Sequence, residues 1–461
     1  MKISNLVING KTVKKVGVFG LGKSNAGVVD YISRKYDNVI FYLRSDKPIE
    51  QDDGMRVKLF KEIYKDAHAY EEPEEDILFL SPSVRWDKAE LSPFKDRGAI
   101  LSSDADFFFK NFKDDVFAIS GSDGKSTTST LTYLLLTERY SPLSLCGNIG
   151  SAMTPLLSSY TQAAVSELSS FQLMNISPRS RRALITNITP NHLDWHTSFE
   201  EYVRAKENIY TNAEERVFCC DFTHTKELVA KYTPFALYSL YMPEKELRAI
   251  SKSEVYIYLE DGYITANGER LLSIDDISAK GMHNVSNFMA AIAMSYGLIS
   301  KQQIVKVAKE FKGLRHRNMP IYRKSDITFY DSSIDSTPKR TVTTILSHSE
   351  RLTLILGGKS KALPYDELCE PIKQKVGTVV ITGENQREIY DALCRGKVQD
   401  SGVRILLSDS FDKAVISAIN SAKSGESVLL SPASTSYDTF KNFEERGDAF
   451  ATIVKNFYGE P

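Results

Sequence analysis

The stretch from Gly121 to Thr127 carries residue types that can hold a polyphosphate. It follows the apolar run 116–119, which predicts a buried strand, and precedes the apolar spacing of a helix. The backbone N–H groups of a glycine-rich loop and the N-terminus of the following helix attract negative charge. Lys125 can reach terminal phosphates, and the Ser126 hydroxyl can coordinate Mg²⁺. The full pattern has a glycine where this chain has Ile119, so the loop is a shortened variant. We predict that it binds ATP through Gly121, Ser122, Asp123, Gly124, Lys125, Ser126 and Thr127. The alternative is an ordinary turn with a solvated lysine.

A second glycine turn, Gly20-Leu21-Gly22, follows the apolar run 16–19 and opens a helix from about Ser24. A dinucleotide fingerprint needs a third glycine at the position of Asn25 and an acidic residue ending the next strand. That strand ends in FYLRSD instead, where Arg44 suits a phosphate or sugar phosphate. The turn therefore favours a diphosphate-bearing substrate such as a UDP-sugar over NAD. A helix start without a ligand is the alternative.

Composition and charge limit the class of protein. Hydrophobic residues make up 42% of the 461 residues and charged residues 25%, which indicates a folded, soluble chain. The net charge of −1 disfavours a nucleic-acid binder. The N-terminus lacks the apolar core of a signal peptide, and no apolar stretch approaches the ~20 residues of a membrane span. We expect a cytoplasmic monomer without nucleic-acid or membrane partners. The five cysteines show no CxxC pairing, so we expect them to be buried and unpaired.

Strands alternate with helices over most of the chain, which predicts an α/β fold. At about 150 residues per domain, the length suits three domains. The first, residues 1–112, has a small parallel sheet built on the runs 16–19, 39–43, 77–80 and 99–101. The second, residues 113–313, ends in an antiparallel meander whose turns are Asp-Gly and Asn-Gly. The third, residues 314–461, is predicted to be a second doubly wound sheet.

Eight motifs follow one another along the chain in the order SGSDGKST, CGNIG, SELSSFQL, TNITPNHLDWH, YVRAKENIY, GMHNVSNFMAA, GLRHR and LLSPASTSYDTFKNFEERGDAF. In this order they resemble the Mur ligase family over all three predicted domains. The resemblance implies a Rossmann-like UDP-binding domain, a P-loop ATPase-like central domain and a Rossmann-like third domain. It also implies an ATP-dependent ligase of peptidoglycan precursor synthesis. The reaction that the resemblance implies is phosphorylation of the carboxylate of UDP-N-acetylmuramoyl-L-alanine and addition of D-glutamate through an acyl phosphate.

The resemblance also implies roles for single residues. Ligands of Mg²⁺, of which two ions are expected, would be Ser126, Glu167, His192 and Lys206. Nucleotide contacts beyond the loop would be Asn284, Asn287, Arg317 and Asp331. Contacts to the UDP-substrate would be Lys23, Ser24, Arg44, Ser45, Asn148, Ser169, Gln172 and His192. Residues acting in catalysis would be Lys125, His192, Lys206 and Arg317, with Arg317 reaching the γ-phosphate only after the domains close. By residue type alone, Glu167 could be a solvated charge, and the three asparagines could belong to helix starts.

Lys206 stands within an apolar stripe at helical spacing that runs from Phe199 through Tyr202 and Val203 to Ile209. Burial favours the neutral amine of a lysine, and a neutral amine can add CO₂. The family resemblance implies a carbamylated lysine at this position, whose two oxygens suit a hard cation. The alternative is a lysine whose ammonium reaches water along the protein surface.

The third domain departs from the family pattern where the amino acid is expected to bind. The usual Asp-Ser-Lys-Ala-Thr-Asn run is DSSIDS here, so a lysine is missing and Asp335 appears. The matching amino-acid contacts are Lys361, Ser436 and Phe443. D-glutamate remains favoured, and another amino acid within the family is the close alternative.

Two further classes of protein stay open from the sequence. A folylpolyglutamate synthetase-like ligase shares the phosphate loop and the three-domain plan, but it has no use for the N-terminal glycine turn and Arg44. A nucleotide-binding regulatory protein without chemistry is the other. Pterin binding would identify the first, and phosphate release with candidate amino acids would exclude the second.

Overall fold

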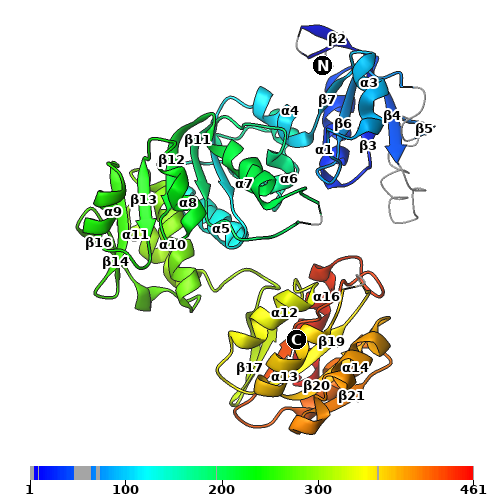
Figure 1. Ribbon diagram of the computed structural model, residues 1–461, viewed down its shortest axis with the longest axis vertical. Helices are drawn as coiled ribbons and strands as arrows, with labels where there is room; N and C mark the ends of the chain where they lie inside the picture. The colour runs from blue at the N-terminus through cyan, green and yellow to red at the C-terminus, as the bar shows by residue number, and fades with distance from the viewer. Residues whose placement is uncertain are drawn as a thin grey trace. The chain divides into compact units, whose positions relative to one another are not determined.

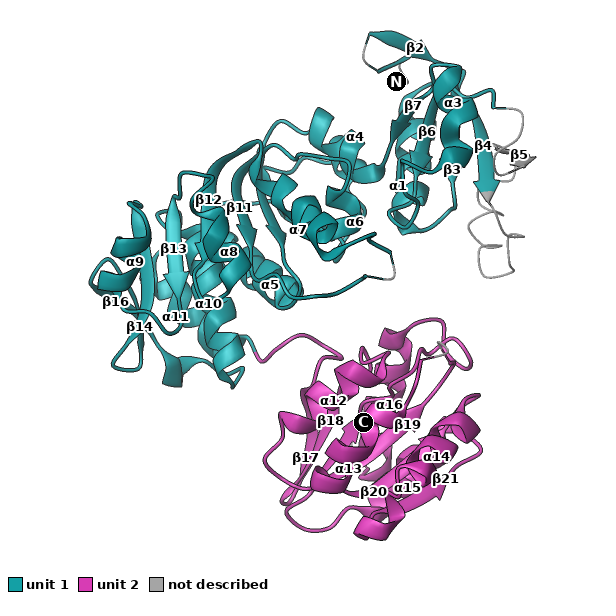
Figure 2. Ribbon diagram, in the orientation of Figure 1, with its two compact units in different colours: residues 1–311 teal, residues 312–461 magenta. Residues whose placement is uncertain are grey.

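The computed structural model describes residues 5–8, 10–45, 64–68, 73–193, 195–360 and 363–459. It has the predicted α/β architecture, in which largely parallel sheets are flanked by helices (Figure 1). The chain separates into two compact units, residues 1–311 and residues 312–461 (Figure 2).

The N-terminal sheet is parallel, as predicted. In pairing order its strands are β5 (Tyr64–His68), β4 (Ile40–Ser45), β3 (Lys15–Phe19), β6 (Ile77–Leu80) and β7 (Ile100–Ser102). Only β5 was not predicted. An antiparallel hairpin of β1 (Leu6–Ile8) and β2 (Lys11–Val13) precedes the sheet. Asn25 takes the place of a third glycine because its buried amide donates to the carbonyl oxygens of Phe19 and Gly20 and closes the turn.

The central sheet has nine strands and includes the predicted meander as its far edge. In pairing order they are β16 (Glu269–Ser273), β15 (Tyr263–Ala266), β14 (Val255–Glu260), β13 (Ala236–Ser239), β12 (Ala213–Cys219), β11 (Ser180–Ile185), β8 (Asp115–Ser120), β10 (Ala163–Glu167) and β9 (Leu143–Gly147). Strands β8 to β14 pair in parallel, and β15 and β16 are antiparallel. At the two hairpin turns, Asp261, Gly262, Asn267 and Gly268 all have positive φ, as a tight turn between twisted strands requires.

Helices cover both faces of the central sheet. Alternate strand residues such as Ala118 and Phe218 pack in one buried cluster with Tyr202, Leu228 and Leu247 of three helices. The opposite face is covered by α5 and α10, which also pack against each other. Among the described residues, the α-helices of the first unit are α1 (Lys23–Lys35), α3 (Ser92–Asp96), α4 (Asp104–Asn111), α5 (Lys125–Leu136), α6 (Ser170–Leu173), α7 (Phe199–Glu207), α8 (Thr223–Leu228), α9 (Glu244–Ile250), α10 (Met282–Ser295) and α11 (Lys301–Glu310).

Helix α4 joins the N-terminal sheet to the central sheet. Its Phe107 packs in the N-terminal core, whereas the adjacent Phe108 packs in the central core. Both sheets therefore belong to one compact unit, although the predicted boundary at residue 112 falls between their strands. The predicted boundary near residue 313 falls where the second unit begins.

The second unit contains a six-stranded sheet. In pairing order its strands are β17 (Met319–Lys324), β18 (Ile327–Asp331), β22 (Ser427–Leu430), β19 (Leu352–Gly357), β20 (Val376–Thr382) and β21 (Arg404–Leu407). Five of them pair in parallel, which agrees with the predicted doubly wound sheet, and β17 adds an antiparallel edge strand. Its helices are α12 (Pro338–Leu346), α13 (Cys369–Lys375), α14 (Gln386–Arg395), α15 (Phe411–Ser421) and α16 (Phe443–Phe457).

The cysteines are unpaired, and four are buried as predicted. The prediction is wrong for Cys394, which is exposed on α14 because it lies off the buried face formed by Ile389, Ala392 and Leu393. Within the described chain, no helix is both long and apolar enough to cross a membrane.

Candidate active site

The carboxyl ends of β8, β9 and β10 meet at one edge of the central sheet. Because the strands are parallel, Glu167 at the end of β10 stands opposite Ile119 on β8 and Gly147 on β9. The phosphate loop follows β8 directly, so the loop and the Glu167 carboxylate come to the same edge. Ligands of open parallel sheets bind at such edges.

The phosphate loop is shaped by two glycines with positive φ. Gly121 has φ 149°, and a β-carbon there would lie 1.9 Å from Thr186 Oγ1. Gly124, with φ 77°, caps the N-terminus of α5. Between them, the backbone N–H groups of Ser122 and Asp123 donate to Asn187 O and Oδ1, each over 2.9 Å. The strand-loop-helix geometry that the sequence predicts is therefore present.

Lys125 and its neighbours open helix α5. The Lys125 ammonium donates to the carbonyl oxygen of Ser122 over 2.7 Å, which keeps it over the loop. Ser126 and Thr127 follow in the first turn, both 7% exposed. The helix N-terminus and this ammonium together favour an anion at the loop.

Asn287 lies next to the phosphate loop although it is far along the chain. Its Oδ1 accepts a hydrogen bond from Thr128 Oγ1 over 3.3 Å, and a β-carbon on Gly124 would lie 2.6 Å from that oxygen. Asn284 Oδ1 accepts a hydrogen bond of 3.3 Å from Asn287 Nδ2, and Asn284 Nδ2 donates to the carbonyl oxygen of Lys280. The pair of asparagines that the resemblance links to adenine is thus brought beside the loop by the packing of α10 on α5.

Glu167 is fully buried, so its interpretation as a solvated charge is wrong. Its Oε1 accepts a hydrogen bond of 2.7 Å from Asn148 Nδ2. Its Oε2 is buried and has no hydrogen-bond partner among the described residues. Asn148 caps no described helix, so the helix-start alternative for this residue is also wrong. A buried carboxylate oxygen that lacks a donor fits a cation.

No three His, Cys, Asp or Glu side chains in the described ranges gather into a ready-made metal site. A cation at Glu167 would therefore take its remaining oxygens from other groups. The Ser126 hydroxyl, substrate phosphates and a carbamate on Lys206 are of the chemical kind that Mg²⁺ prefers.

Lys206 is 2% exposed, so the alternative of an ammonium reaching water is wrong. Its Nζ donates to the carbonyl oxygen of Gly121 over 2.7 Å and to Ser120 Oγ over 3.3 Å, and it lies 4.8 Å from the centre of the Tyr202 ring. Burial lowers the pKa of Lys206 well below its ordinary value, and the nearby charge of Lys125 adds to this effect. The structure therefore favours a neutral amine beside the phosphate loop.

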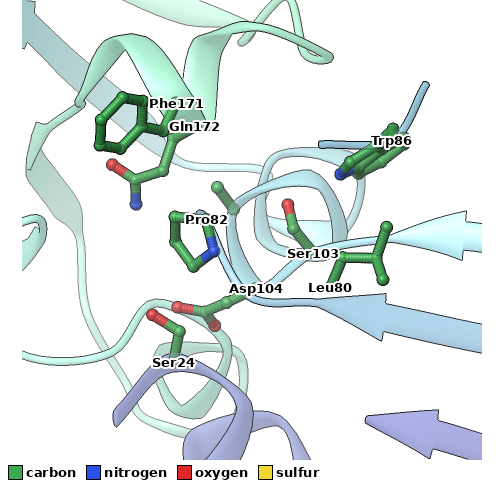
Figure 3. A pocket seen from close by; sticks show the side chains of 9 residues that line it. Ser24, Leu80, Pro82, Trp86, Ser103, Asp104, Phe171 and Gln172 are labelled. Atoms are coloured by element: carbon green, nitrogen blue, oxygen red, sulfur yellow. The ribbon is translucent and has the colours of Figure 1, made fainter. Parts of the chain in front are cut away.

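A pocket lies between loops of the N-terminal sheet and helix α6 (Figure 3). Two residues of the predicted UDP-substrate site, Ser24 and Gln172, line it. Its lining residues are Ser24, Leu80, Pro82, Trp86, Ser103, Asp104, Ala105, Phe171 and Gln172. Burial raises the pKa of Asp104, which accepts hydrogen bonds from the backbone N–H groups of Met153 and Thr154.

Other predicted substrate residues lie around this pocket. Lys23 donates to the carbonyl oxygen of Gly150 in the CGNIG segment. Ser169 and Gln172 form a capping box at the start of α6, in which each side chain bonds the backbone N–H of the other. His192 is exposed, has φ 55°, and its ring lies 4.9 Å from that of Phe171.

Arg44 is fully buried inside the N-terminal sheet. Its guanidinium forms a bidentate ion pair with Glu75 and lies over the Phe94 ring at 4.7 Å. The contact of Arg44 with a substrate phosphate stays a prediction. The backbone of Ser45 ends β4, and its side chain lies outside the described part of the structure.

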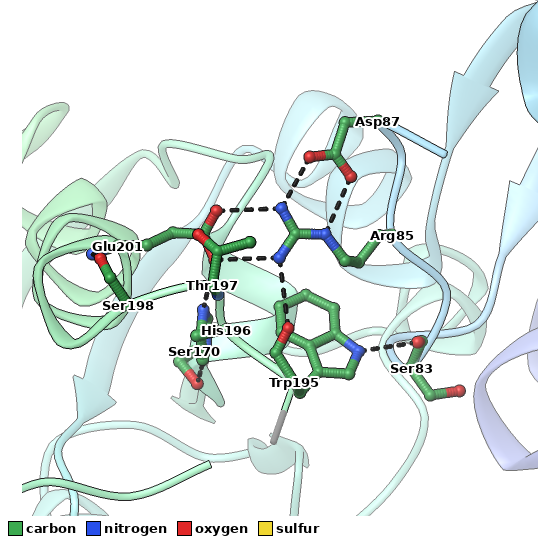
Figure 4. A network of polar contacts seen from close by, with 9 residues as sticks. All are labelled: Ser83, Arg85, Asp87, Ser170, Trp195, His196, Thr197, Ser198 and Glu201. Atoms are coloured by element: carbon green, nitrogen blue, oxygen red, sulfur yellow. Dashed lines mark hydrogen bonds and ion pairs between the residues drawn. The ribbon is translucent and has the colours of Figure 1, made fainter. Parts of the chain in front are cut away.

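A network of charged side chains beside the pocket was not predicted from the sequence (Figure 4). Arg85 binds Glu201 through two hydrogen bonds of 2.9 Å, and His196 lies between Glu201 and Ser170. A local signal existed only for Glu201, because Ser198 and Glu201 have the spacing of a helix-capping pair. Nothing local in the sequence points from Arg85 to a residue so far along the chain.

The remaining predicted residues belong to the second unit. Asp331 ends β18, and its Oδ2 pairs with His316 Nδ1 at 2.7 Å. The half-buried Arg317 follows His316, whose ring lies 6.2 Å from that of Phe443. Ser436 is 2% exposed in the loop after β22. Lys361 lies outside the described residues.

Asp335, the acidic residue that departs from the family pattern, is 5% exposed. Its Oδ2 accepts hydrogen bonds from Thr344 Oγ1 over 2.7 Å and from Ser431 Oγ over 2.8 Å. The carboxylate therefore has partners within the fold of the second unit.

Known proteins resemble this chain over nearly its whole length. A family model described as the Mur ligase middle domain matches residues 119–295. The UDP-N-acetylmuramoylalanine–D-glutamate ligase of Ruminiclostridium cellulolyticum is 34% identical over 96% of this chain and 97% of its own. The enzyme of the same name from Acetivibrio thermocellus is 36% identical over 96% of each chain.

Solved structures share the fold at lower identity. A UDP-N-acetylmuramate–alanine ligase from Thermotoga maritima has a TM-score of 0.59 and 17% identity, covering 96% of this chain and 99% of its own. A pseudomurein peptide ligase type C from Methanothermus fervidus has a TM-score of 0.55 and 18% identity, covering 96% of this chain and all of its own.

Proposed function

Because this chain belongs to the Mur ligase family of ATP-dependent ligases, which use Mg²⁺, we propose that it joins D-glutamate to UDP-N-acetylmuramoyl-L-alanine. The relatives of that name, alike over 96% of the chain, support this choice of substrates. The observation that carries the proposal is that Lys206 and Glu167 are both buried at the edge of the sheet that holds the phosphate loop. The reaction belongs to peptidoglycan precursor synthesis, and we propose that the enzyme works as a cytoplasmic monomer.

The proposed reaction has two steps in which the atoms balance. A carboxylate oxygen of the L-alanyl group attacks the γ-phosphorus of ATP, and ADP leaves. The amine of D-glutamate then attacks the carbon of the acyl phosphate, loses a proton, and inorganic phosphate leaves as the amide forms. Both steps bring anions together, so cationic groups must offset their repulsion.

The chain supplies such groups at the phosphate loop. Lys125 and the N-terminus of α5 face the polyphosphate, and Arg317 would add a guanidinium from the second unit when ATP binds. Asn284 and Asn287 would meet the adenine, with Asp331 near the nucleotide. Loss of one such stabilising donor commonly lowers turnover by ~10²–10³.

Magnesium ions would be held by Ser126, Glu167, His192 and a carbamylated Lys206, and we propose two ions. Bound there, Mg²⁺ would neutralise phosphate and carboxylate oxygens. The neutral amine that burial favours at Lys206 is the form that adds CO₂. The carbamate would turn this neutral amine into an anionic ligand for Mg²⁺.

The two substrates would bind on different parts of the chain. The UDP-substrate would occupy the pocket of Figure 3 and its surroundings, with contacts from Lys23, Ser24, Arg44, Ser45, Asn148, Ser169, Gln172 and His192. D-glutamate would be held in the second unit by Lys361, Ser436 and Phe443.

Phosphate release with purified protein, ATP and UDP-N-acetylmuramoyl-L-alanine tests the proposal when D-glutamate, L-glutamate, D-aspartate and neutral amino acids are compared. We expect D-glutamate to be preferred strongly, because a site built for one charge at a fixed reach rejects analogues. Lys125→Ala should lower turnover by ~10²–10³, whereas Lys301→Ala on the exposed face of α11 should not change it. Preference for a different amino acid would contradict D-glutamate as the substrate, but it would still agree with an ATP-dependent ligase.

A further inference from the structure

We propose that Arg85 is a positioning residue for the nucleotide-sugar substrate, because its network with Glu201 and His196 ties together the two walls of the pocket in Figure 3. One wall comes from the loop after β6 and the other from helix α6. The inference rests on the proposed function, since it names how that substrate's pocket is held.

Arg85 has several partners at once. Its Nη1 and Nη2 donate to the two oxygens of Glu201, each over 2.9 Å, and its Nε and Nη2 donate to Asp87 over 2.9 Å and 2.6 Å. Nη1 also donates to the carbonyl oxygen of Trp195 over 3.2 Å, and the guanidinium lies 5.2 Å from the centre of the Trp195 ring. The planar guanidinium thus fixes both the direction and the distance of its partners.

Trp195 and Glu201 connect Arg85 to helix α6. The Trp195 ring lies 4.5 Å from the ring of Phe171 on that helix. Glu201 Oε2 lies 3.4 Å from His196 Nδ1 without forming a hydrogen bond, and His196 Nε2 is 2.9 Å from Ser170 Oγ. His196 and Ser170 are each 2% exposed, so water does not compete for this contact. Ser170 is the first residue of α6.

Both ends of the network lie within one or two residues of the pocket lining. Arg85 precedes Trp86, and Ser83, which accepts a hydrogen bond of 2.9 Å from Trp195 Nε1, follows Pro82. At the other end, Ser170 precedes Phe171 and Gln172 (Figures 3 and 4). The network therefore sets how far apart the two walls stand.

The arrangement is more than a surface ion pair. The side chains of Arg85 and Glu201 are 17% and 11% exposed, and the pair is bidentate. Hydrogen bonds from Arg85 hold the pKa of Glu201 at about 2, so the pair stays charged at neutral pH.

The contacts of α7 with the phosphate loop do not pass through Arg85. On this helix, Tyr202 bonds Ser122 Oγ over 2.7 Å and Lys206 bonds the carbonyl of Gly121. Loss of Arg85 should therefore weaken binding of the nucleotide sugar and leave ATP binding unchanged. A residue that only stabilised the fold would not separate the two substrates in this way.

The test measures KM for each substrate and kcat in Arg85→Gln, Arg85→Lys, Glu201→Gln and the double variant. We expect Arg85→Gln to raise KM for UDP-N-acetylmuramoyl-L-alanine about tenfold with KM for ATP within twofold, and Arg85→Lys to recover part of the loss. The double variant should be no worse than the poorer single variant. The matched control is Arg179→Gln, which breaks the exposed pair with Glu214 and should change neither KM.

Equilibrium dialysis of UDP-N-acetylmuramoyl-L-alanine against folded Arg85→Gln gives the same comparison without turnover. An unchanged affinity, or equal weakening of ATP and nucleotide sugar, would overturn the role of Arg85 while the wild-type enzyme remained active. Wild-type protein that neither binds this nucleotide sugar nor releases phosphate would contradict the proposed function itself and this inference with it.

Discussion

The side-chain nitrogen of Lys206 lies 2.7 Å from the carbonyl oxygen of Gly121, the first glycine of the phosphate loop. This contact brings a buried amine from helix α7 to the edge of the sheet where the Glu167 carboxylate also ends. Burial and the charge of Lys125 lower the pKa of Lys206. A neutral, buried amine is suited to modification by CO₂. The carbamate can be tested by removing the amine and supplying a small carboxylate in its place.

Lys206→Ala should lose most activity, by at least about a hundredfold, because a carboxylate-like ligand for Mg²⁺ disappears. Acetate should restore part of the activity, because its oxygens can occupy the space that the side chain leaves. Rates are measured over a range of acetate and Mg²⁺ concentrations. Lys301→Ala is the control and should neither lose activity nor respond to acetate. Full activity of Lys206→Ala at limiting Mg²⁺ would exclude the carbamate.

Gly124→Ala should weaken ATP binding, because the added methyl group would lie 2.6 Å from Asn287 Oδ1. Gly262→Ala is a matched control with φ 76° instead of 77° and nothing within 4 Å of the added β-carbon. Both substitutions place a side chain in the left-handed region, which costs about 1–2 kcal/mol of unfolding free energy. KM for ATP should rise only in Gly124→Ala. An equal rise in both variants would mean that backbone strain, and not the position of Asn287, determines the effect.

Asp335→Asn should leave the choice of amino acid unchanged, because the buried carboxylate bonds Thr344 and Ser431 within the fold. Asp335→Ala should lower the unfolding free energy by about 1–3 kcal/mol, because two buried hydroxyls lose their acceptor. The measurements are phosphate release with D-glutamate, L-glutamate and D-aspartate, and unfolding in urea. A changed preference in Asp335→Asn would give this carboxylate a direct role in specificity.

Glu201 should contribute to the acid sensitivity of the first unit. Its pKa is lowered from 4.5 to about 2, chiefly by the hydrogen bond from Arg85. A carboxyl group with a lowered folded-state pKa stabilises the fold above its unfolded pKa and loses that contribution as pH falls toward the folded value. The stability advantage of wild type over Glu201→Gln should therefore shrink between about pH 5 and pH 3, as urea unfolding would measure. A constant difference over this range would contradict the lowered pKa.

Local patterns in the sequence were enough for several parts of the site. The phosphate loop follows from an apolar strand, two glycines and a helix start within one short segment, and the structure has this geometry. The burial of Lys206 follows from its place on the apolar stripe of α7, because helical periodicity alone determines which residues share a face. The meander follows from Asp261-Gly262 and Asn267-Gly268, whose conformations are set within each turn.

Only the tertiary structure decided which partners these residues have. The guanidinium of Arg44 pairs with Glu75, and the amide of Asn148 bonds Glu167. The substrate contacts of both residues stay predictions. Arg85 and Glu201 are 116 residues apart in the chain. Such contacts depend on the order and register of strands and on the packing of helices across them. These are properties of the whole folded unit that no local run of residues specifies.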